Sequence, residues 1–312
     1  MLISRCSKYI SIDGESQILD EEARVHIDQI KDHWSSQGKR VILLARKTVP
    51  KGLLKSSPSS SSFENEVMNL AKTDLTLVGI VGIVDPPRDE IPSVMSTLRG
   101  AGIRIFMVTG DFALTAQAIA TECGIITNPP NMVRSISALS RTAVSLSSST
   151  NEKPTDVDSP LITTSIVLSG PELITLSDIQ WDQLCKYDEI VFARTTPEQK
   201  LRIVRELQKR DEIVAMTGDG VNDAPSLKAA DIGIALGGGS DIAIEAADMV
   251  LLESFSAVVE AVQYGRVVFD NLKKTIAYLL PAGSFAEFWP IMANIVFGVP
   301  QILSSFLMII IW

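Results

Sequence analysis

Cysteine and histidine are scarce in this chain of 312 residues, which contains three cysteines and two histidines. Cys6, Cys123 and Cys185 lie far apart and follow no metal-ligand spacing. This odd, unpatterned set argues against a disulfide framework or a zinc site and favours reduced thiols. His26 and His33 lie on a polar stretch with helical spacing. The two histidines therefore indicate a solvated helix face rather than a metal site.

The chain also lacks a basic stripe, and its formal net charge is −9. Nucleic acid is therefore excluded as an expected partner. The N-terminus has no basic segment followed by an apolar one, so nothing in it predicts secretion. The length predicts about two domains, and an apolar content of 46% is enough for a sizeable core.

Short apolar runs alternate with helical patterns over most of the chain. The runs that predict strands are 41–45, 75–84, 103–108, 166–168, 190–193, 212–216, 232–236 and 249–252. This alternation predicts an α/β fold with a Rossmann-like parallel sheet. Residues 128–160 are rich in Ser, Thr and Pro, and we expect them to form a flexible insertion.

One loop, residues 217–225, is the strongest candidate for chemistry. It follows an apolar run, it is spaced by glycines, and it carries the carboxylates of Asp219 and Asp223. A loop at the carboxyl end of a parallel strand is where ligands bind in such sheets. Two carboxylates there suit a hard cation that bridges to a phosphate. The alternative is a solvated acidic turn.

Three further loops support or qualify this interpretation. A second strand ends in the same Thr-Gly-Asp sequence at 109–111, and a loop of this kind can offer N–H groups and a hydroxyl to an anion. Lys200 lies one turn into a helix that Thr196 and Pro197 begin, and it either reaches a phosphate or is a surface lysine. Residues 237–239 are three glycines, which we interpret as turn chemistry.

The C-terminal part predicts a membrane segment. From Ile276 to Val299 the only ionisable residue is Glu287, and a bilayer span needs about 20 apolar residues. Residues 302–312 begin a second apolar segment. Basic residues before the span predict an integral membrane protein in a lipid bilayer with its α/β domain in the cytosol. Glu287 and Asn294 share a helical stripe, which indicates half of a site for a transported cation.

These stretches together resemble the P-type cation-transporting ATPases, nearest the animal-type sodium/potassium and calcium pumps. The matching sequences are Asp85-Pro-Pro-Arg88, Met107-Val-Thr-Gly-Asp111, Arg194-Thr-Thr-Pro-Glu-Gln-Lys200, Thr217-Gly-Asp-Gly-Val-Asn-Asp-Ala-Pro225, Ala229-Ala-Asp-Ile-Gly-Ile234, Glu245-Ala-Ala-Asp248 and Asn271-Leu-Lys-Lys274. The resemblance implies an ion-translocating ATP hydrolase that uses ATP and Mg²⁺. Its phosphorylation domain, of haloacid-dehalogenase type, transfers the γ-phosphoryl group to an aspartate.

The resemblance also implies roles for the catalytic residues. Asp219 would ligate Mg²⁺, and Asn222 and Asp223 would order the loop around the phosphate. Thr109 and Lys200 would hold the phosphoryl oxygens, Thr109 by its hydroxyl and Lys200 by its charge. These roles agree with phosphoryl transfer, which depends mostly on positioning and charge neutralisation.

On the nucleotide side, the resemblance implies that Gly110, Asp111 and Arg194 line the site. Arg40 matches an arginine that reaches the ATP phosphates from the nucleotide-binding domain. The domains implied are a partial nucleotide-binding domain at 1–74, a phosphorylation domain at 75–257, and a membrane stalk with a transmembrane helix at 258–312.

The chain departs from the family at its most important position. No Asp-Lys-Thr-Gly-Thr stretch, which carries the nucleophile, occurs in the sequence, and neither does the Lys-Gly-Ala-Pro stretch of the nucleotide domain. We therefore expect a C-terminal catalytic fragment whose partners are the missing nucleotide, actuator and membrane segments of a parent pump. The alternatives are an inactive fragment that at most binds nucleotide or Mg²⁺, and a soluble phosphatase of the same superfamily. The transported ion is open, with a monovalent cation favoured.

Overall fold

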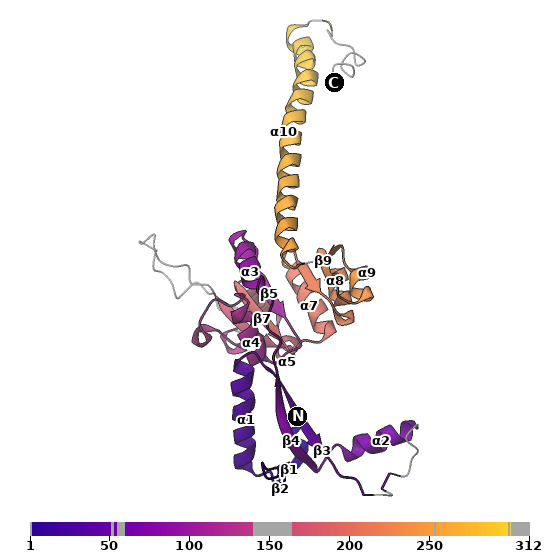
Figure 1. Cartoon of the computed structure of the whole chain (residues 1–312). Coiled ribbons are helices and arrows are strands. Elements are labelled where there is room, and N and C mark those ends of the chain that lie inside the picture. The colour runs from indigo at the N-terminus through magenta and orange to yellow at the C-terminus, as the bar shows by residue number, and fades with distance from the viewer. Residues whose placement is uncertain are drawn as a thin grey trace, which may run out of the picture. The chain divides into compact units, whose positions relative to one another are not determined.

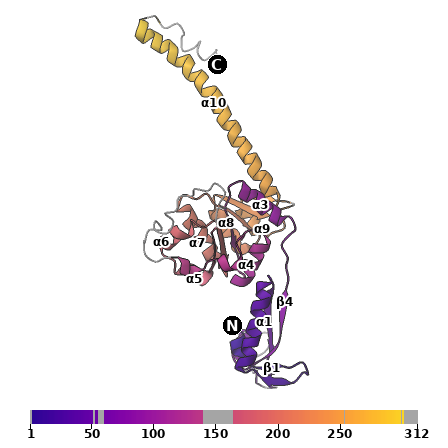
Figure 2. The same cartoon turned by 90° about the vertical axis from the view of Figure 1, so that its left-hand side faces the viewer.

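The computed structural model describes residues 2–50, 53–54, 60–139, 164–252, 254–298 and 300, with the backbone alone at 61 and 282–287. The chain divides into two compact units, residues 1–255 and residues 256–312 (Figures 1 and 2).

The N-terminal part of the first unit is a four-stranded sheet with the order β2-β1-β4-β3. Its elements are η1 (Ile3–Arg5), β1 (Cys6–Ile10), β2 (Ser16–Ile18), α1 (Glu21–Ser36), β3 (Arg40–Arg46), α2 (Ser61–Leu70) and β4 (Leu75–Ile83). Helix α1 begins where Asp20 accepts a hydrogen bond from the Ala23 N–H at 2.9 Å. We did not predict α2, which Ser60 caps.

The small core of this part comprises Cys6, Leu19, Leu75 and Leu77. Ile42 of β3 and Val81 of β4 are paired in register and exposed at 42% and 45%, so they lie on the opposite face of the sheet. One face of this sheet thus carries exposed aliphatic side chains.

The rest of the unit alternates strands with helices, as predicted. The strands are β5 (Ile105–Val108), β6 (Ser165–Ser169), β7 (Glu189–Ala193), β8 (Ala215–Gly218), β9 (Ile232–Leu236) and β10 (Met249–Leu251). The helices are α3 (Ile91–Gly100), α4 (Ala113–Glu122), α5 (Gly170–Ile174), α6 (Asp178–Leu184), α7 (Pro197–Gln208), α8 (Ala224–Ala229) and α9 (Asp241–Ala246), with short 3₁₀ turns η2 (Pro130–Met132), η3 (Ile136–Ala138) and η5 (Val221–Asp223). All pairings among these strands are parallel, so the predicted α/β class is confirmed.

The parallel strands form two three-stranded sheets, β5-β7-β6 and β10-β9-β8, where we expected one. β7 is buried along its whole length, whereas every residue of β5 and β8 is at least partly exposed. β5 and β8 are therefore edge strands, each only four residues long.

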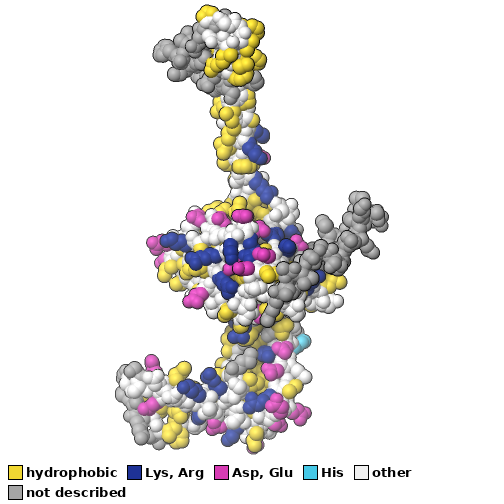
Figure 3. All heavy atoms as spheres, turned by 180° about the vertical axis from the view of Figure 1, so that it is seen from behind, with side chains coloured by type: hydrophobic (Ala, Val, Ile, Leu, Met, Phe, Trp, Pro, Cys, Tyr) yellow, Lys and Arg dark blue, Asp and Glu magenta, His cyan; other side chains and the backbone are white. Residues whose placement is uncertain are grey.

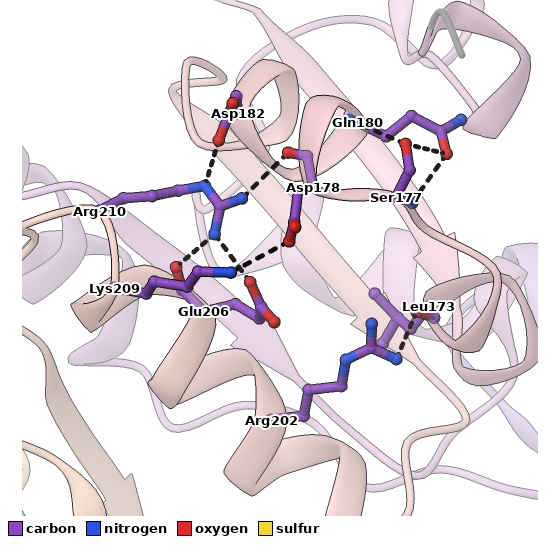
Figure 4. Close-up of polar contacts among 9 residues, drawn as sticks. All are labelled: Leu173, Ser177, Asp178, Gln180, Asp182, Arg202, Glu206, Lys209 and Arg210. Carbon is purple, nitrogen blue, oxygen red and sulfur yellow. Dashed lines mark hydrogen bonds and ion pairs between the residues drawn. The ribbon is translucent and has the colours of Figure 1, made fainter.

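Helices α6 and α7 are braced by a buried arginine at the end of α7 (Figure 4). Arg210 donates from Nε to Asp182 at 2.7 Å, from Nη1 to Glu206 at 2.8 Å, and from Nη2 to the Asp178 carbonyl at 3.0 Å. Its side chain is only 14% exposed, and its contacts join α7 to α6. Because α7 carries Lys200 at its other end, the brace also fixes a candidate site residue.

The predicted insertion at 128–160 lies only partly within the described residues. Residues 128–139 contain η2 and η3, Arg134 forms a bridge with Ile166, and Leu139 is buried. Residues 140–163 lie outside the described part of the chain.

Among its described residues, the second unit contains one helix, α10 (Ala257–Phe297), which includes Pro281 and Pro290 and ends at Gly298. Across the described residues, no helix combines the length and the apolar character that crossing a membrane requires. The predicted transmembrane helix is therefore not borne out. The predicted second segment, 302–312, lies outside the described residues.

Candidate functional site

Three loops at the carboxyl ends of β5, β7 and β8 carry most of the candidate residues. The first two loops are joined by their backbones. Thr109 N–H donates to the Phe192 carbonyl at 2.9 Å, Thr195 N–H donates to the Thr109 carbonyl at 3.0 Å, and Arg194 N–H donates to the Asp111 carbonyl at 2.8 Å. The loop at 109–111 is thus held in place by the end of the neighbouring parallel strand.

Lys200 and Asp223, which the sequence places in separate motifs, meet in an ion pair. Lys200 Nζ lies 2.6 Å from Asp223 Oδ1, and their side chains are 15% and 10% exposed. Gly218 makes room for this carboxylate, because a Cβ at Gly218 would lie 2.6 Å from the Asp223 Cβ. The surface-lysine alternative is therefore wrong for Lys200.

The carboxylate of Asp219, unlike that of Asp223, is not paired with another side chain among the described residues. The residue is exposed, and within the described part of the chain its carboxylate forms no hydrogen bond or ion pair. Its backbone carbonyl, in contrast, accepts a hydrogen bond from the Ser240 N–H at 2.8 Å. Asn222 is exposed in the same loop. An oxygen ligand is therefore available beside the Lys200–Asp223 pair.

Magnesium fits this arrangement as a partner of one carboxylate. The described residues contain no group of three or more His, Cys, Asp or Glu side chains that could hold a metal. Mg²⁺, however, is commonly bound through one or two carboxylates together with water and phosphate oxygens, without a full protein cage. The free Asp219 carboxylate would be such a ligand.

Arg40 reaches the loop at 109–111 from β3. Its Nη2 lies 2.6 Å from Asp111 Oδ1, and its Nε donates to the same oxygen at 2.8 Å. The Thr109 hydroxyl donates to Asp111 Oδ2 at 3.3 Å. Asp111 therefore connects two predicted phosphate-side residues, Arg40 and Thr109, through one carboxylate.

Arg194 has a strained backbone with φ +52°, in the region that favours glycine. Gly170 leaves room for the Arg194 carbonyl, because a Cβ at position 170 would collide with it. The Arg194 guanidinium lies 4.9 Å above the Phe112 ring, a cation–π contact that we did not predict. Arg194 is thereby aimed over the residue next to Asp111.

β5 and β8 approach each other without pairing. Arg104 directly precedes β5 and Glu212 precedes β8, and Arg104 Nη2 lies 2.5 Å from Glu212 Oε1. This ion pair links the segments that precede the two strands, and within the described part of the chain β5 and β8 belong to different sheets. Thr109 and Asp219 therefore follow two strands whose described edges are both unpaired.

The predicted cation ligands are far from these loops in the sequence, and they belong to the other unit. Glu287 and Asn294 are both within α10, in the unit 256–312. The side chain of Glu287 lies outside the described residues. The Asn294 carbonyl accepts a hydrogen bond from the Gly298 N–H at 3.0 Å, which ends the helix.

Sequence reasoning missed the part played by the glycines at 237–239. The structure places Gly239 and Ser240 against the backbone of Asp219, so this turn belongs to the site. The only signal was the run of glycines itself, which is equally typical of an ordinary turn.

Both parts of the first unit match known protein families. Residues 1–90 match the family described as the cytoplasmic domain N of P-type ATPases, and residues 168–231 match the haloacid dehalogenase-like hydrolases. The chain is 41% identical over 302 residues to the potassium-transporting ATPase alpha chain 2 of Oryctolagus cuniculus, covering 96% of this chain and 26% of that protein. It is 39% identical over 307 residues to the sodium/potassium-transporting ATPase subunit alpha of Drosophila melanogaster, covering 97% of this chain and 28% of that protein.

Proposed function

Because this chain is a member of the P-type ATPase family by homology and spans 26% to 28% of the relatives it matches, we propose that it supplies the phosphate-binding part of an ATP-driven cation pump. In this proposal Mg²⁺-dependent phosphoryl transfer runs from ATP to an aspartate on another segment of the pump. The observation that carries the proposal is the Lys200–Asp223 pair, which lies beside the free carboxylate of Asp219.

The residues divide the work by charge. Asp219 would hold Mg²⁺, which when bound neutralises charge on the phosphate oxygens. Lys200 would provide a fixed positive charge for the same oxygens, and Asp223 holds its ammonium in place at 2.6 Å. Asn222 would order the loop, the Thr109 hydroxyl would bind phosphoryl oxygens, and Gly110 would line the nucleotide side.

Arg40, Asp111 and Arg194 would form the nucleotide side of the site. In the structure Asp111 neutralises Arg40 through a pair whose arginine is 62% exposed. Arg194 is exposed and stacked on Phe112, so its guanidinium is available to a triphosphate. Arg40 contacts Asp111 of the loop at 109–111, and Arg194 lies over Phe112, the residue after it.

The open edges of β5 and β8 support the proposal that the nucleophile comes from elsewhere. A strand that paired with both edges would complete a single parallel sheet and would end between Thr109 and Asp219. The sequence contains no Asp-Lys-Thr-Gly-Thr stretch of its own. A strand ending in that stretch would place its aspartate between the two loops.

The transport half of the proposal rests on the relatives and on α10. The names of the relatives specify potassium or sodium and potassium, which favours a monovalent cation. Glu287 and Asn294 are seven positions apart in α10, close to two helical turns, and would act as ligands on one stripe. The unit 1–255 would face the cytosol, because that is where the pump meets ATP.

A second candidate function is an inactive fragment that binds nucleotide or Mg²⁺ without turnover. The absence of the nucleophile stretch from the sequence favours it whenever the chain acts alone. The two candidates differ in one measurable property, which is whether the chain takes part in forming an aspartyl phosphate when the missing strand is supplied.

The test is acid-stable labelling with γ-³²P-ATP, performed on the chain alone and on the chain co-expressed with a segment that carries Asp-Lys-Thr-Gly-Thr. We expect no label on the chain alone and a hydroxylamine-sensitive label on the added segment. Lys200→Ala should abolish the label, whereas Lys228→Ala, a matched exposed lysine in α8, should preserve it. Label on the chain alone, or none in the complex, would contradict the proposal.

A further inference from the structure

The backbone of Asp219 is held by the loop between β9 and α9, residues 237–240. Ser240 N–H donates to the Asp219 carbonyl at 2.8 Å. The neighbouring Gly239 packs directly against the same peptide group: a Cβ added to it would lie 2.8 Å from the Asp219 oxygen and 3.1 Å from the Asp219 Cα. The added Cβ would also lie 3.0 Å from the Leu236 oxygen at the end of β9, so a side chain at 239 would have to displace the Asp219 backbone, the end of β9 or both.

The next glycine in the loop provides a contrast. A Cβ added to Gly238 would meet no atom within 4 Å. Neither Gly238 nor Gly239 has a positive φ, so neither is required for its backbone conformation. Close approach to Asp219 is thus a property of Gly239 and not of the glycine run as a whole.

The loop has little freedom to yield, because it is tied to three other elements. Gly237 N–H donates to the Leu251 carbonyl of β10 at 2.7 Å, and Gly239 N–H donates to the Leu236 carbonyl of β9 at 2.9 Å. The Ser240 hydroxyl accepts from the Ala243 N–H at 3.3 Å and caps α9. A displacement forced at position 239 should consequently fall on Asp219.

We propose that Gly239 and the Ser240 N–H are positioning groups that fix the direction of the Asp219 carboxylate and thereby set the Mg²⁺ affinity of this site. The proposal rests on the proposed function, in which Asp219 ligates Mg²⁺. The physical reason is that the Cα–Cβ bond of Asp219 follows the orientation of its own peptide groups. A ligand carboxylate whose outer supports are removed typically loses about 10-fold to 100-fold in metal affinity.

The test measures binding of Mn²⁺, which takes the same oxygen ligands as Mg²⁺, to the full chain by electron paramagnetic resonance of the free ion. Gly239→Ala should weaken the affinity by about tenfold, the lower end for outer supports, while Gly238→Ala should leave it unchanged. In the Asp219→Asn background Gly239→Ala should have little further effect, since coupled residues give non-additive changes.

A second pair of variants separates the effect of the Ser240 N–H on Asp219 from a general loss of folding. Ser240→Pro removes the N–H donor, and proline suits the native φ of −72° at this residue. Ser240→Ala keeps the N–H and removes only the cap. We expect weaker Mn²⁺ binding for Ser240→Pro than for Ser240→Ala, with circular dichroism confirming that both remain folded.

The outcomes distinguish this inference from the proposed function. If Asp219→Asn weakens binding while Gly239→Ala and Ser240→Pro bind like the wild type, the positioning role is overturned and the metal ligand stands. An equal loss from Gly239→Ala with and without Asp219 would also overturn it. If the wild-type chain binds no Mn²⁺, or Asp219→Asn binds as well as it, the metal ligand of the proposed function fails and this inference fails with it.

Discussion

The ammonium of Lys200 and the carboxylate of Asp223 lie 2.6 Å apart, and the pair joins α7, which follows the strand β7, to η5, which follows β8. It therefore connects a helix of one three-stranded sheet to a loop of the other. Side chains that are only 15% and 10% exposed exclude most water from the pair. The site and the junction of the two sheets thus share the same two residues.

Lys200→Met should lower the free energy of unfolding. The substitution leaves the Asp223 carboxylate buried without its partner, and loss of one member of a buried pair costs about 3 kcal/mol. Urea denaturation followed by circular dichroism measures the change. Lys228→Met, a lysine on the exposed side of α8, should change the free energy by less than about 0.5 kcal/mol.

The double variant Lys200→Met with Asp223→Asn provides the control. It removes both charges together, so it should recover part of the stability that Lys200→Met loses. Equal stability of Lys200→Met and the wild type would show that the pair is solvated in solution. The burial seen at these two residues would then be contradicted.

Arg40→Ala should affect ligand binding far more than stability. Because the Arg40 side chain is 62% exposed, its pair with Asp111 should contribute less than about 1 kcal/mol to unfolding. Titration with a fluorescent ATP analogue should show weaker binding, since a phosphate-side cation is lost. Arg46→Ala, at the other end of the same strand and exposed, is the matched control. A large drop in stability with unchanged nucleotide affinity would show that Arg40 stabilises the fold and does not bind the nucleotide.

The α/β alternation could be predicted because buried parallel strands leave continuous apolar runs, such as 190–193 in the fully buried β7. The loops at 109–111 and 217–219 were found for the same reason, since each directly follows such a run. The resemblance placed Lys200 and Asp223 around one phosphate, but no local pattern predicts their ion pair, because the two residues lie 23 positions apart in the sequence.

Other features depend on tertiary packing that leaves no periodic signal. The contact of Gly239 with Asp219 is a matter of close approach, and a glycine run gives the same pattern whether or not another backbone lies against it. The separation of the parallel strands into two sheets depends on which strand edges pair, and the apolar runs do not encode this pairing. The predicted span at 276–299 relied on composition, and among the described residues no helix is long and apolar enough to cross a membrane.

Asp231 should make the protein lose stability in acid. Its carboxylate accepts the Val214 N–H at 2.8 Å, and this backbone hydrogen bond, together with a hydrogen bond from the Gln208 side chain, lowers the pKa of Asp231 below its ordinary value. The folded state thus holds the proton less tightly than the unfolded state. The contribution is present above the unfolded pKa and is lost as the pH falls through the lower folded pKa.

The pH dependence of unfolding in urea, measured from pH 6 down to about pH 2, should therefore be shallower in Asp231→Asn than in the wild type. The difference between the two slopes should appear at pH values below the ordinary carboxyl pKa, where Asp231 is still ionised in the folded state but protonated in the unfolded state. Asp13→Asn, at an exposed turn residue, is the control. Identical slopes for Asp231→Asn and the wild type would contradict the role of this hydrogen bond.

The cysteines should be unreactive in the folded protein. Burial raises the pKa of the Cys123 and Cys185 thiols, and it is the largest influence on both. Because the thiolate is the reactive form, alkylation by iodoacetamide at pH 8 should be slow in the native state and fast in urea. Mass spectrometry of partly labelled protein measures this difference, and rapid native labelling at either cysteine would contradict the burial of that residue.

Glu189 is a fully buried charged residue outside the site. Its side chain is fully buried at the start of β7, 3.2 Å from Arg99 Nη2, and it accepts hydrogen bonds from the Thr127 N–H, the Thr127 hydroxyl and the Ser165 hydroxyl at 3.0, 2.6 and 2.5 Å. These groups come from the end of α3, the loop after α4 and the strand β6. One carboxylate therefore anchors three separate segments to the central strand.

Glu189→Ala should destabilise the chain by about 3 kcal/mol or more, because it leaves three polar donors and the half-buried Arg99 guanidinium without their acceptor. Glu189→Gln keeps the shape and one acceptor oxygen, so we expect a smaller loss. Asp188→Ala, at the preceding residue, removes an exposed carboxylate that, in the described part of the chain, accepts hydrogen bonds from Thr164 alone, so it should cost less than either. If thermal unfolding ranked Glu189→Ala with Asp188→Ala, the anchoring role of Glu189 would be excluded, because an acceptor shared by three segments cannot be removed without loss.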